Sequence, residues 1–144
     1  FEFPLTIIRP SAVYGPTDNN FRVIQKFIEC ALNNETINAN NPSSNRLDFT
    51  YVKDAAKGIK LATFFNKNSI NEFNITRGES RSLQDAINII KSFFPKIKIN
   101  ITDKKGIYPK RGTLDISKAK GLLKFNPSYC LEDGIKDYLD FLKK

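Results

Sequence analysis

Residues 5–16 read LTIIRPSAVYGP, and this stretch decides the class of fold. Residues 5–8 form a short run of apolar and β-branched side chains, which is typical of a strand buried on both faces in a parallel sheet. Arg9 and Pro10 end the run, and Tyr-Gly-Pro at residues 14–16 predicts a turn. We therefore expect a parallel strand that leads directly into a turn.

Outward from this stretch, helices and strands are predicted to alternate, which favours an α/β fold with a small mixed sheet and flanking helices. Apolar residues at helical spacing predict helices over 21–32, 54–65, 82–94, 117–123 and 131–142. Apolar runs and alternation predict strands over 47–52, 72–76 and 97–101. The Asn- and Ser-rich residues 33–45 are predicted to form a loop, with a short extended piece at 36–37.

Two of the predicted helices begin at a residue that is suited to capping. Asp54 is expected to cap the helix that follows it, because its side chain can accept a hydrogen bond from a free backbone N–H. Ser82 is followed three residues later by Asp85, which resembles a capping box with Asp in place of the usual Glu or Gln.

The composition excludes several classes of site. The chain has 144 residues, no His and two Cys, so a His-based triad and a Cys-rich zinc site are both excluded and no metal site is expected. Two Cys are typical of a reducing compartment, and we expect a cytoplasmic protein. No apolar run approaches the roughly 20 residues of a membrane-spanning helix, so no membrane partner is expected.

The chain also contains no Met and begins inside an apolar run. We therefore expect it to be part of a longer protein.

Positive charge is concentrated in one region. The formal net charge is +8, and residues 91–124 alone hold ten basic and two acidic side chains. Such a region attracts anions, whether nucleic acid, acidic membrane or a phosphorylated small molecule. A solvated Lys-rich surface explains it equally well.

Four segments in order resemble one known family. They are residues 5–16, RLDFTYVKD at 46–54, FNITRG at 73–78, and RGTLDISKAK at 111–120 with Asn-Pro following at 126–127. Together they resemble the C-terminal half of the extended short-chain dehydrogenases/reductases, which include NAD-dependent nucleotide-sugar epimerases and dehydratases. The resemblance implies an N-terminal Rossmann domain that binds NAD through a Gly-rich turn, a catalytic Tyr-x-x-x-Lys, and a smaller domain that closes over the nucleotide-sugar.

This chain contains neither the Gly-rich motif nor Tyr-x-x-x-Lys, so it holds no expected catalytic residue and is predicted to be inactive alone. By the resemblance, residues 1–34 are the last Rossmann strand, its turn and the following helix. Residues 35–144 are the substrate-binding region, and the NAD-binding domain is absent. The expected ligand is a UDP- or dTDP-linked sugar, and the full-length protein is expected to be a homodimer that binds no nucleic acid.

The resemblance places Pro10, Ser11 and Ala12 beside the nicotinamide and the sugar. Many members have Asn at the position of Ala12, where it hydrogen-bonds the substrate, and Ala cannot make that bond. The same resemblance places Asn20, Arg22 and Val23, at the start of a helix, against the nucleotide diphosphate. Helix N-terminal N–H groups and an Arg both suit phosphate, although an exposed surface Arg is the plain alternative.

Arg46, Arg111 and Asp115 complete the candidate substrate site. Family members commonly have Arg directly before Asp-Phe, but here Leu47 stands between Arg46 and the Asp. One residue of offset moves a strand side chain to the other face, so Arg46 can reach the diphosphate only if a bulge or the loop end redirects it. Arg111 matches a second phosphate-contacting Arg, and its planar guanidinium suits a diphosphate. Asp115 is expected either to reach the ribose or to cap the helix after it.

Three further interpretations remain open at the level of sequence. Cys130 lies near the start of the last helix, which can lower a thiol pKa, but an inert thiol is the simpler expectation. The basic character also allows a nucleic-acid-binding module, whose affinity should fall steeply with salt. A stand-alone interaction domain that lost its chemistry is the third possibility.

Overall fold

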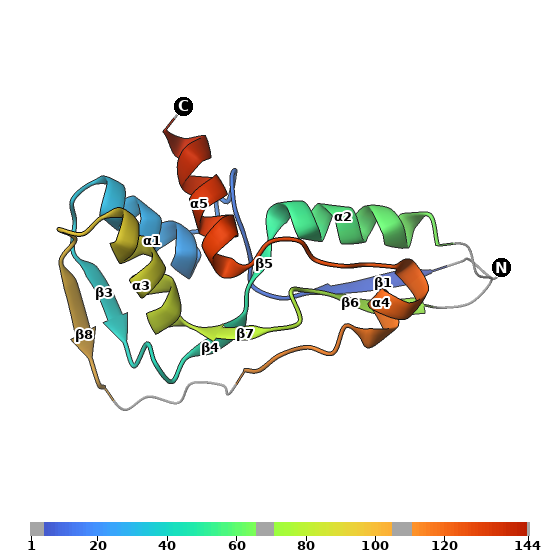
Figure 1. Ribbon diagram of the computed structural model, residues 1–144. Coiled ribbons are helices and arrows are strands. Elements are labelled where there is room, and N and C mark those ends of the chain that lie inside the picture. The colour runs from blue at the N-terminus through green and yellow to red at the C-terminus, as the bar shows by residue number, and fades with distance from the viewer. Residues whose placement is uncertain (1–4, 66–70, 105–110, 144) are drawn as a thin grey trace.

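The computed structural model describes residues 5–65, 71–104 and 111–143 (Figure 1). Its helices are α1 (Val23–Leu32), α2 (Val52–Thr63), α3 (Leu83–Phe93), α4 (Ser117–Leu123) and α5 (Leu131–Leu142). Its strands are β1 (Thr6–Pro10), β2 (Val13–Tyr14), β3 (Ile37–Asn40), β4 (Arg46–Asp48), β5 (Thr50–Tyr51), β6 (Asn71–Ile75), β7 (Ser80–Ser82) and β8 (Ile99–Thr102). The predicted α/β class is confirmed.

The described strands pair two by two, and the pairing is mixed. β1 with β6, β2 with β5, and β3 with β8 are parallel, whereas β4 with β7 is antiparallel. Figure 1 shows β1 and β6 at one end, β3 and β8 at the other, and the β4–β7 pair joining them.

The end that contains β1 and β6 has its own small core. α2 packs on both strands and α4 packs on β6. Phe73, Ile75 and Phe125 are fully buried there, and Ile8 packs against them. Leu5 and Ile7, however, are 50% and 40% exposed. The prediction of a strand buried on both faces is therefore wrong, because the helices described cover only one face of β1.

The larger core lies where α1, α3 and α5 meet. α3 packs on both α1 and α5, α1 contacts β3, and α5 contacts β5. The apolar stripes predicted for the three helices are confirmed, since Ile28, Ile87 and Ile135 are fully buried. This core carries the first turn of α1, which belongs to the site described below.

The region predicted as a loop contains the strand β3. Ile37 and Ala39 enter the core, while the alternate Asn side chains pair with β8. Asn100 Nδ2 donates to Asn38 Oδ1 at 3.0 Å, and Thr102 Oγ1 donates to Asn40 Oδ1 at 3.0 Å. The extended piece predicted at 36–37 overlaps the start of β3, but the loop prediction is wrong over residues 38–40. A partner strand about 60 residues away, not local propensity, satisfies the polar groups there.

The two capping predictions had different outcomes. The Ser82 capping box is confirmed: Ser82 Oγ accepts from Asp85 N at 3.1 Å, and Asp85 Oδ2 accepts from Ser82 N at 2.9 Å. Asp54 does not cap α2, which begins earlier with Tyr51 at the N-cap. Its buried carboxylate instead accepts backbone N–H groups of Ser128 at 2.8 Å and Tyr129 at 2.9 Å, fixing the chain before α5.

A single strand predicted over 47–52 is divided at Phe49 into β4 and β5, which pair with different partners. None of the helices in the described ranges is long and apolar enough to cross a membrane.

Candidate functional site

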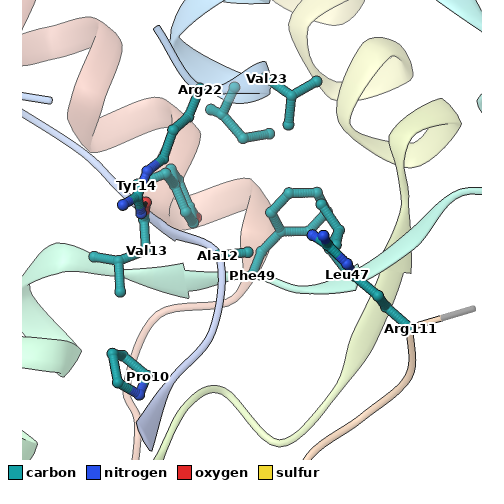
Figure 2. A pocket seen from close by; sticks show the side chains of 10 residues that line it. Pro10, Ala12, Val13, Tyr14, Arg22, Val23, Leu47, Phe49 and Arg111 are labelled. Atoms are coloured by element: carbon teal, nitrogen blue, oxygen red, sulfur yellow. Dashed lines mark hydrogen bonds between the residues drawn. The ribbon is translucent and has the colours of Figure 1, made fainter. Parts of the chain in front are cut away.

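A cavity of about 550 Å³ opens between the β1–β2 turn, the start of α1 and the β4–β5 region (Figure 2). This volume lies in the range of small-molecule sites. Its walls are mainly apolar, with a guanidinium on each of two sides. The lining residues are Pro10, Ala12, Val13, Tyr14, Arg22, Val23, Ile24, Leu47, Phe49 and Arg111.

A smaller hollow of about 270 Å³ adjoins this cavity. Four residues line both hollows: Pro10, Val13, Tyr14 and Arg22. The smaller hollow is also lined by Asn20. The structure thus gathers Pro10, Ala12, Asn20, Arg22, Val23 and Arg111 of the predicted residues around two connected hollows.

The backbone of the β1–β2 turn is tightly constrained. Ala12 adopts a left-handed conformation with φ of 38°, which is uncommon for a residue with a side chain. Gly15 has φ of 142°, and a Cβ there would lie 2.5 Å from Val52 Cγ1. Only glycine fits at residue 15, and its close approach to α2 holds the turn against the cavity.

Tyr14 forms a buried wall of the cavity. Its ring meets Phe49 edge-on at 6.3 Å between centroids, and its hydroxyl donates to the Leu131 carbonyl at 3.4 Å. Burial raises the pKa of Tyr14, and the nearby Tyr51 raises it further. A phenol that is both buried and hydrogen-bonded stays neutral, so Tyr14 serves as a wall and not as a general base.

Arg22 is the N-cap residue of α1 and has extended backbone. Its Nη1 donates to the Val13 carbonyl at 3.1 Å, which holds the exposed guanidinium across the mouth of the cavity. Asn20 is occupied locally, since its backbone N and side-chain Nδ2 both donate to Asp18 Oδ1, at 3.1 and 3.4 Å. Because Arg22 is the N-cap residue, its guanidinium lies next to the first backbone N–H groups of α1.

Arg111 approaches from the opposite wall. Figure 2 shows its guanidinium reaching toward Leu47 and Phe49. Within the described ranges, no carboxylate forms an ion pair with Arg111 or with Arg22. Residues 105–110, which precede Arg111 in the positively charged region 91–124, lie outside the described residues.

Arg46 does not line the cavity. β4 pairs with β7 in regular register, without the bulge that would redirect this side chain. Arg46 Nη2 donates to the Ser80 carbonyl at 2.5 Å and Nε to Ser80 Oγ at 3.3 Å. Leu47, on the other face of the strand, takes the place beside the cavity.

Ser11 and Asp115 also stand apart from the lining residues. Ser11 is half-buried. Asp115 is exposed, and its carboxylate accepts the Ser117 N–H at 2.8 Å. Hydrogen bonding from the Ser117 side chain, and then from the Ser117 backbone, lowers the pKa of this carboxyl. Asp115 is not the N-cap of α4, which is Ile116, but its carboxylate holds the first N–H of that helix.

Comparison with known proteins decides the family. The model of the NAD dependent epimerase/dehydratase family matches residues 1–76. The chain belongs to this family.

Family relatives match along nearly the whole chain. The chain is 30% identical over 99% of its length to an uncharacterized UDP-glucose epimerase, YtcB, of Bacillus subtilis, and covers 45% of that protein. It is 30% identical to UDP-glucuronic acid decarboxylase 3 of Arabidopsis thaliana over 91% of its length, covering 39% of that protein. This member of the NAD-dependent epimerase/dehydratase family thus spans about half the length of the curated relatives it matches.

A solved structure supports the same assignment. UDP-glucuronic acid 4-epimerase from Bacillus cereus, in complex with UDP-glucuronic acid and NAD, matches with a TM-score of 0.87 and 30% identity. The match covers 99% of this chain and 46% of that one.

Sequence reasoning missed several cavity residues of this epimerase-family chain. Phe49 lies inside the strand predicted over 47–52, and it is both buried and part of the cavity wall. Leu47 was noted only as an interruption before Asp48. The signal that identifies both is strand alternation, which places residues 47 and 49 on one face.

The Cys130 thiol and a metal site are the remaining questions raised by the sequence. Burial and a bond to Asp133 raise the pKa of the Cys130 thiol, which favours the inert interpretation. No group of three or more acidic or Cys side chains in the described part of the chain is placed to hold a metal.

Proposed function

We propose that this chain is the C-terminal, substrate-binding half of an NAD-dependent nucleotide-sugar epimerase or dehydratase. The diphosphate of a UDP- or dTDP-sugar would lie between Arg22 and Arg111. The observation that carries this proposal is the pair of guanidiniums on opposite walls of one cavity, neither held by a carboxylate of the described ranges.

The chemistry of the cavity suits a nucleotide diphosphate. A guanidinium binds phosphate oxygens through paired, charge-assisted hydrogen bonds, and it stays charged at any working pH. The start of α1 adds free N–H groups and the positive end of the helix dipole. The apolar walls formed by Val23, Leu47 and Phe49 suit the less polar parts of the ligand.

The relatives favour a uridine nucleotide. YtcB is named a UDP-glucose epimerase, and the Bacillus cereus enzyme was solved with UDP-glucuronic acid. Asp115, which the resemblance places near the ribose, and Asn20, beside the smaller hollow, remain secondary candidates for substrate contact.

NAD would be held mainly by a domain outside this chain. The sequence has no G-x-x-G-x-x-G to hold a pyrophosphate and no Tyr-x-x-x-Lys to move a proton. Pro10 and Ala12 offer an apolar edge at the cavity, with Ser11 between them, which fits one side of a nicotinamide but not a whole dinucleotide. NAD supplies hydride transfer when bound. We expect the 144 residues alone to bind ligand without turnover, and the complete protein to be a homodimer.

The direct test compares Arg111→Gln with the matched control Arg46→Gln in the protein expressed from its complete gene. Both variants remove one exposed guanidinium, but only Arg111 lines the cavity. Titration calorimetry with UDP should show affinity about tenfold lower for Arg111→Gln, the effect of one charge-assisted hydrogen bond. The UDP affinity of Arg46→Gln should stay within about twofold of the unmodified protein, because the Arg46 side chain bonds to Ser80 and not to the cavity.

The proposal would be contradicted if both variants lost the same UDP affinity, or if Arg111→Gln lost none.

Salt dependence of binding distinguishes the proposal from the nucleic-acid alternative. Binding of one diphosphate should weaken modestly as salt rises, whereas binding to many phosphates should fall by orders of magnitude.

A further inference from the structure

We propose that Asp48 is a positioning residue for Arg111. It fastens the segment 112–116 to the back of β4, so that the guanidinium reaches the cavity. The inference rests on the proposed function, in which Arg111 contacts the diphosphate.

Asp48 is a buried carboxylate that joins three segments distant in sequence. It is 1% exposed. Its Oδ2 accepts from Thr76 Oγ1 at 2.9 Å and from the backbone N of Leu114 at 3.1 Å. Its Oδ1 accepts from the backbone N of Gly78 at 3.1 Å. One side chain thus connects β4, the β6–β7 turn and the segment that carries Arg111.

The geometry of β4 explains why this anchor bears on the cavity. Leu47 lines the cavity and Asp48 faces the other side of the strand, because successive side chains alternate. Leu114 follows Arg111 by three residues, a stretch that spans at most about 10 Å. Fixing the Leu114 N–H behind the cavity wall therefore limits where Arg111 can lie.

The other hydrogen bonds of the segment are weaker anchors. Thr113 Oγ1 accepts from Ser80 N at 2.9 Å, and the Asp115 carbonyl accepts from Asn74 Nδ2 at 2.7 Å. Both are exposed bonds between neutral groups, in which water competes. The bond from Leu114 N to Asp48 is shielded and charge-assisted, and its loss would leave a buried group unpaired.

The variant that tests this anchor is Asp48→Asn in the protein expressed from its complete gene. A carboxamide has one acceptor oxygen, so its NH₂ must face either Gly78 N–H or the pair formed by Thr76 and Leu114. We expect the affinity for UDP to fall about fivefold while the affinity for uridine, which has no phosphate, stays unchanged.

Asp54→Asn is the matched control. Asp54 is 2% exposed and accepts two backbone N–H groups, from Ser128 and Tyr129, so its loss disturbs a similar buried anchor. The two residues that Asp54 holds, Ser128 and Tyr129, do not line the cavity. Asp54→Asn should therefore lower the melting temperature like Asp48→Asn but leave UDP affinity within about twofold.

The double variant Asp48→Asn/Arg111→Gln isolates the coupling. If Asp48 acts through Arg111, adding Asp48→Asn to Arg111→Gln should weaken UDP binding no further. Three results would overturn the inference. The double variant could lose UDP affinity by the sum of the two single losses. Asp48→Asn could weaken uridine binding as much as UDP binding, or Asp54→Asn could weaken UDP binding as much as Asp48→Asn does. Failure of the proposed function would appear separately, as unchanged UDP affinity in Arg111→Gln alone.

Leu114→Pro covers the case in which Asp48→Asn does not fold. It deletes the N–H that Asp48 anchors while the carboxylate keeps its bonds from Thr76 and Gly78. The same selective loss for UDP is expected, and unchanged UDP affinity would overturn the inference.

Discussion

Ala12 shows how much a single backbone conformation matters at this site. Its φ of 38° lies in the left-handed region, beside a cavity that its own side chain lines. A residue with a Cβ is held there at a cost of about 1–2 kcal/mol, which the surrounding contacts must offset.

We predict that Ala12→Val lowers the free energy of unfolding by about 1–2 kcal/mol, because a β-branched side chain is strongly disfavoured at positive φ. Ala12→Gly should leave stability unchanged or slightly raised, since relief of strain offsets the added freedom of the unfolded chain. Urea denaturation measures both.

Ala56→Val, at an exposed position of α2, controls for added volume and should cost only about 0.5 kcal/mol. A similar cost at residues 12 and 56 would show that the left-handed conformation of Ala12 carries no strain.

At this scale, the sequence predicted some roles well and missed others. It identified the one-residue offset that Leu47 places between Arg46 and Asp48, because alternation along a strand is local, but it still kept Arg46 as a candidate substrate contact, which the lining of the cavity does not include. It could not show that Asp48 and Asp54 are buried anchors. Their backbone partners lie 66 and 74 residues away, at Leu114 and Ser128, and no local pattern connects them.

At the scale of elements, α2 shows where helix propensity and packing disagree. Gly58 lies inside this helix, where propensity alone would favour Ala. A Cβ at residue 58 would lie 2.2 Å from Ile75 Cγ2 and 3.1 Å from Phe125 Cε2. The glycine therefore allows α2 to pack closely on β6.

We predict that Gly58→Ala lowers the free energy of unfolding by about 1–3 kcal/mol through overpacking, although it improves helix propensity. Gly121→Ala is the matched variant in α4, where a Cβ meets nothing within 4 Å. That change should raise stability by about 1 kcal/mol. Thermal denaturation of both variants checks the contrast, and stabilisation by Gly58→Ala would contradict the close packing.

At the scale of the whole molecule, the basic residues do not form one binding surface around the cavity. The Lys side chains at 91, 96, 98, 104, 118, 120 and 124 are exposed, and Arg111 is the described member of residues 91–124 that lines the cavity. Lys118 lies over the Phe73 ring at 5.1 Å, at the opposite end from β3 and β8. This arrangement favours a solvated surface with one ligand-directed Arg.

The exposed apolar side chains of β1 carry a prediction about association. Ile7 on β1 is 40% exposed, and Leu5, directly before this strand, is 50% exposed. β1 has one hydrogen-bonded neighbour among the described strands. An open edge with apolar side chains promotes pairing between molecules. We expect the 144-residue chain to self-associate at high concentration, and Ile7→Lys to reduce this association.

Light scattering over a concentration series measures the effect. Phe141→Lys is the control, since Phe141 is 50% exposed but lies on α5, away from the strand edge. A monomeric wild-type chain at all concentrations would contradict the prediction, as would equal effects of the two substitutions.

The sequence by itself determined the α/β class, the amphipathic helices, the Ser82 capping box and the family resemblance. Each of these is encoded in short-range periodicity or contiguous motifs, which local chemistry expresses directly. The tertiary structure alone decided which arginines face the cavity, that an Asn-rich segment becomes β3, and that Asp48 and Asp54 anchor distant segments. Those outcomes depend on partners far along the chain, because a buried polar group is satisfied by whichever donor the fold brings to it.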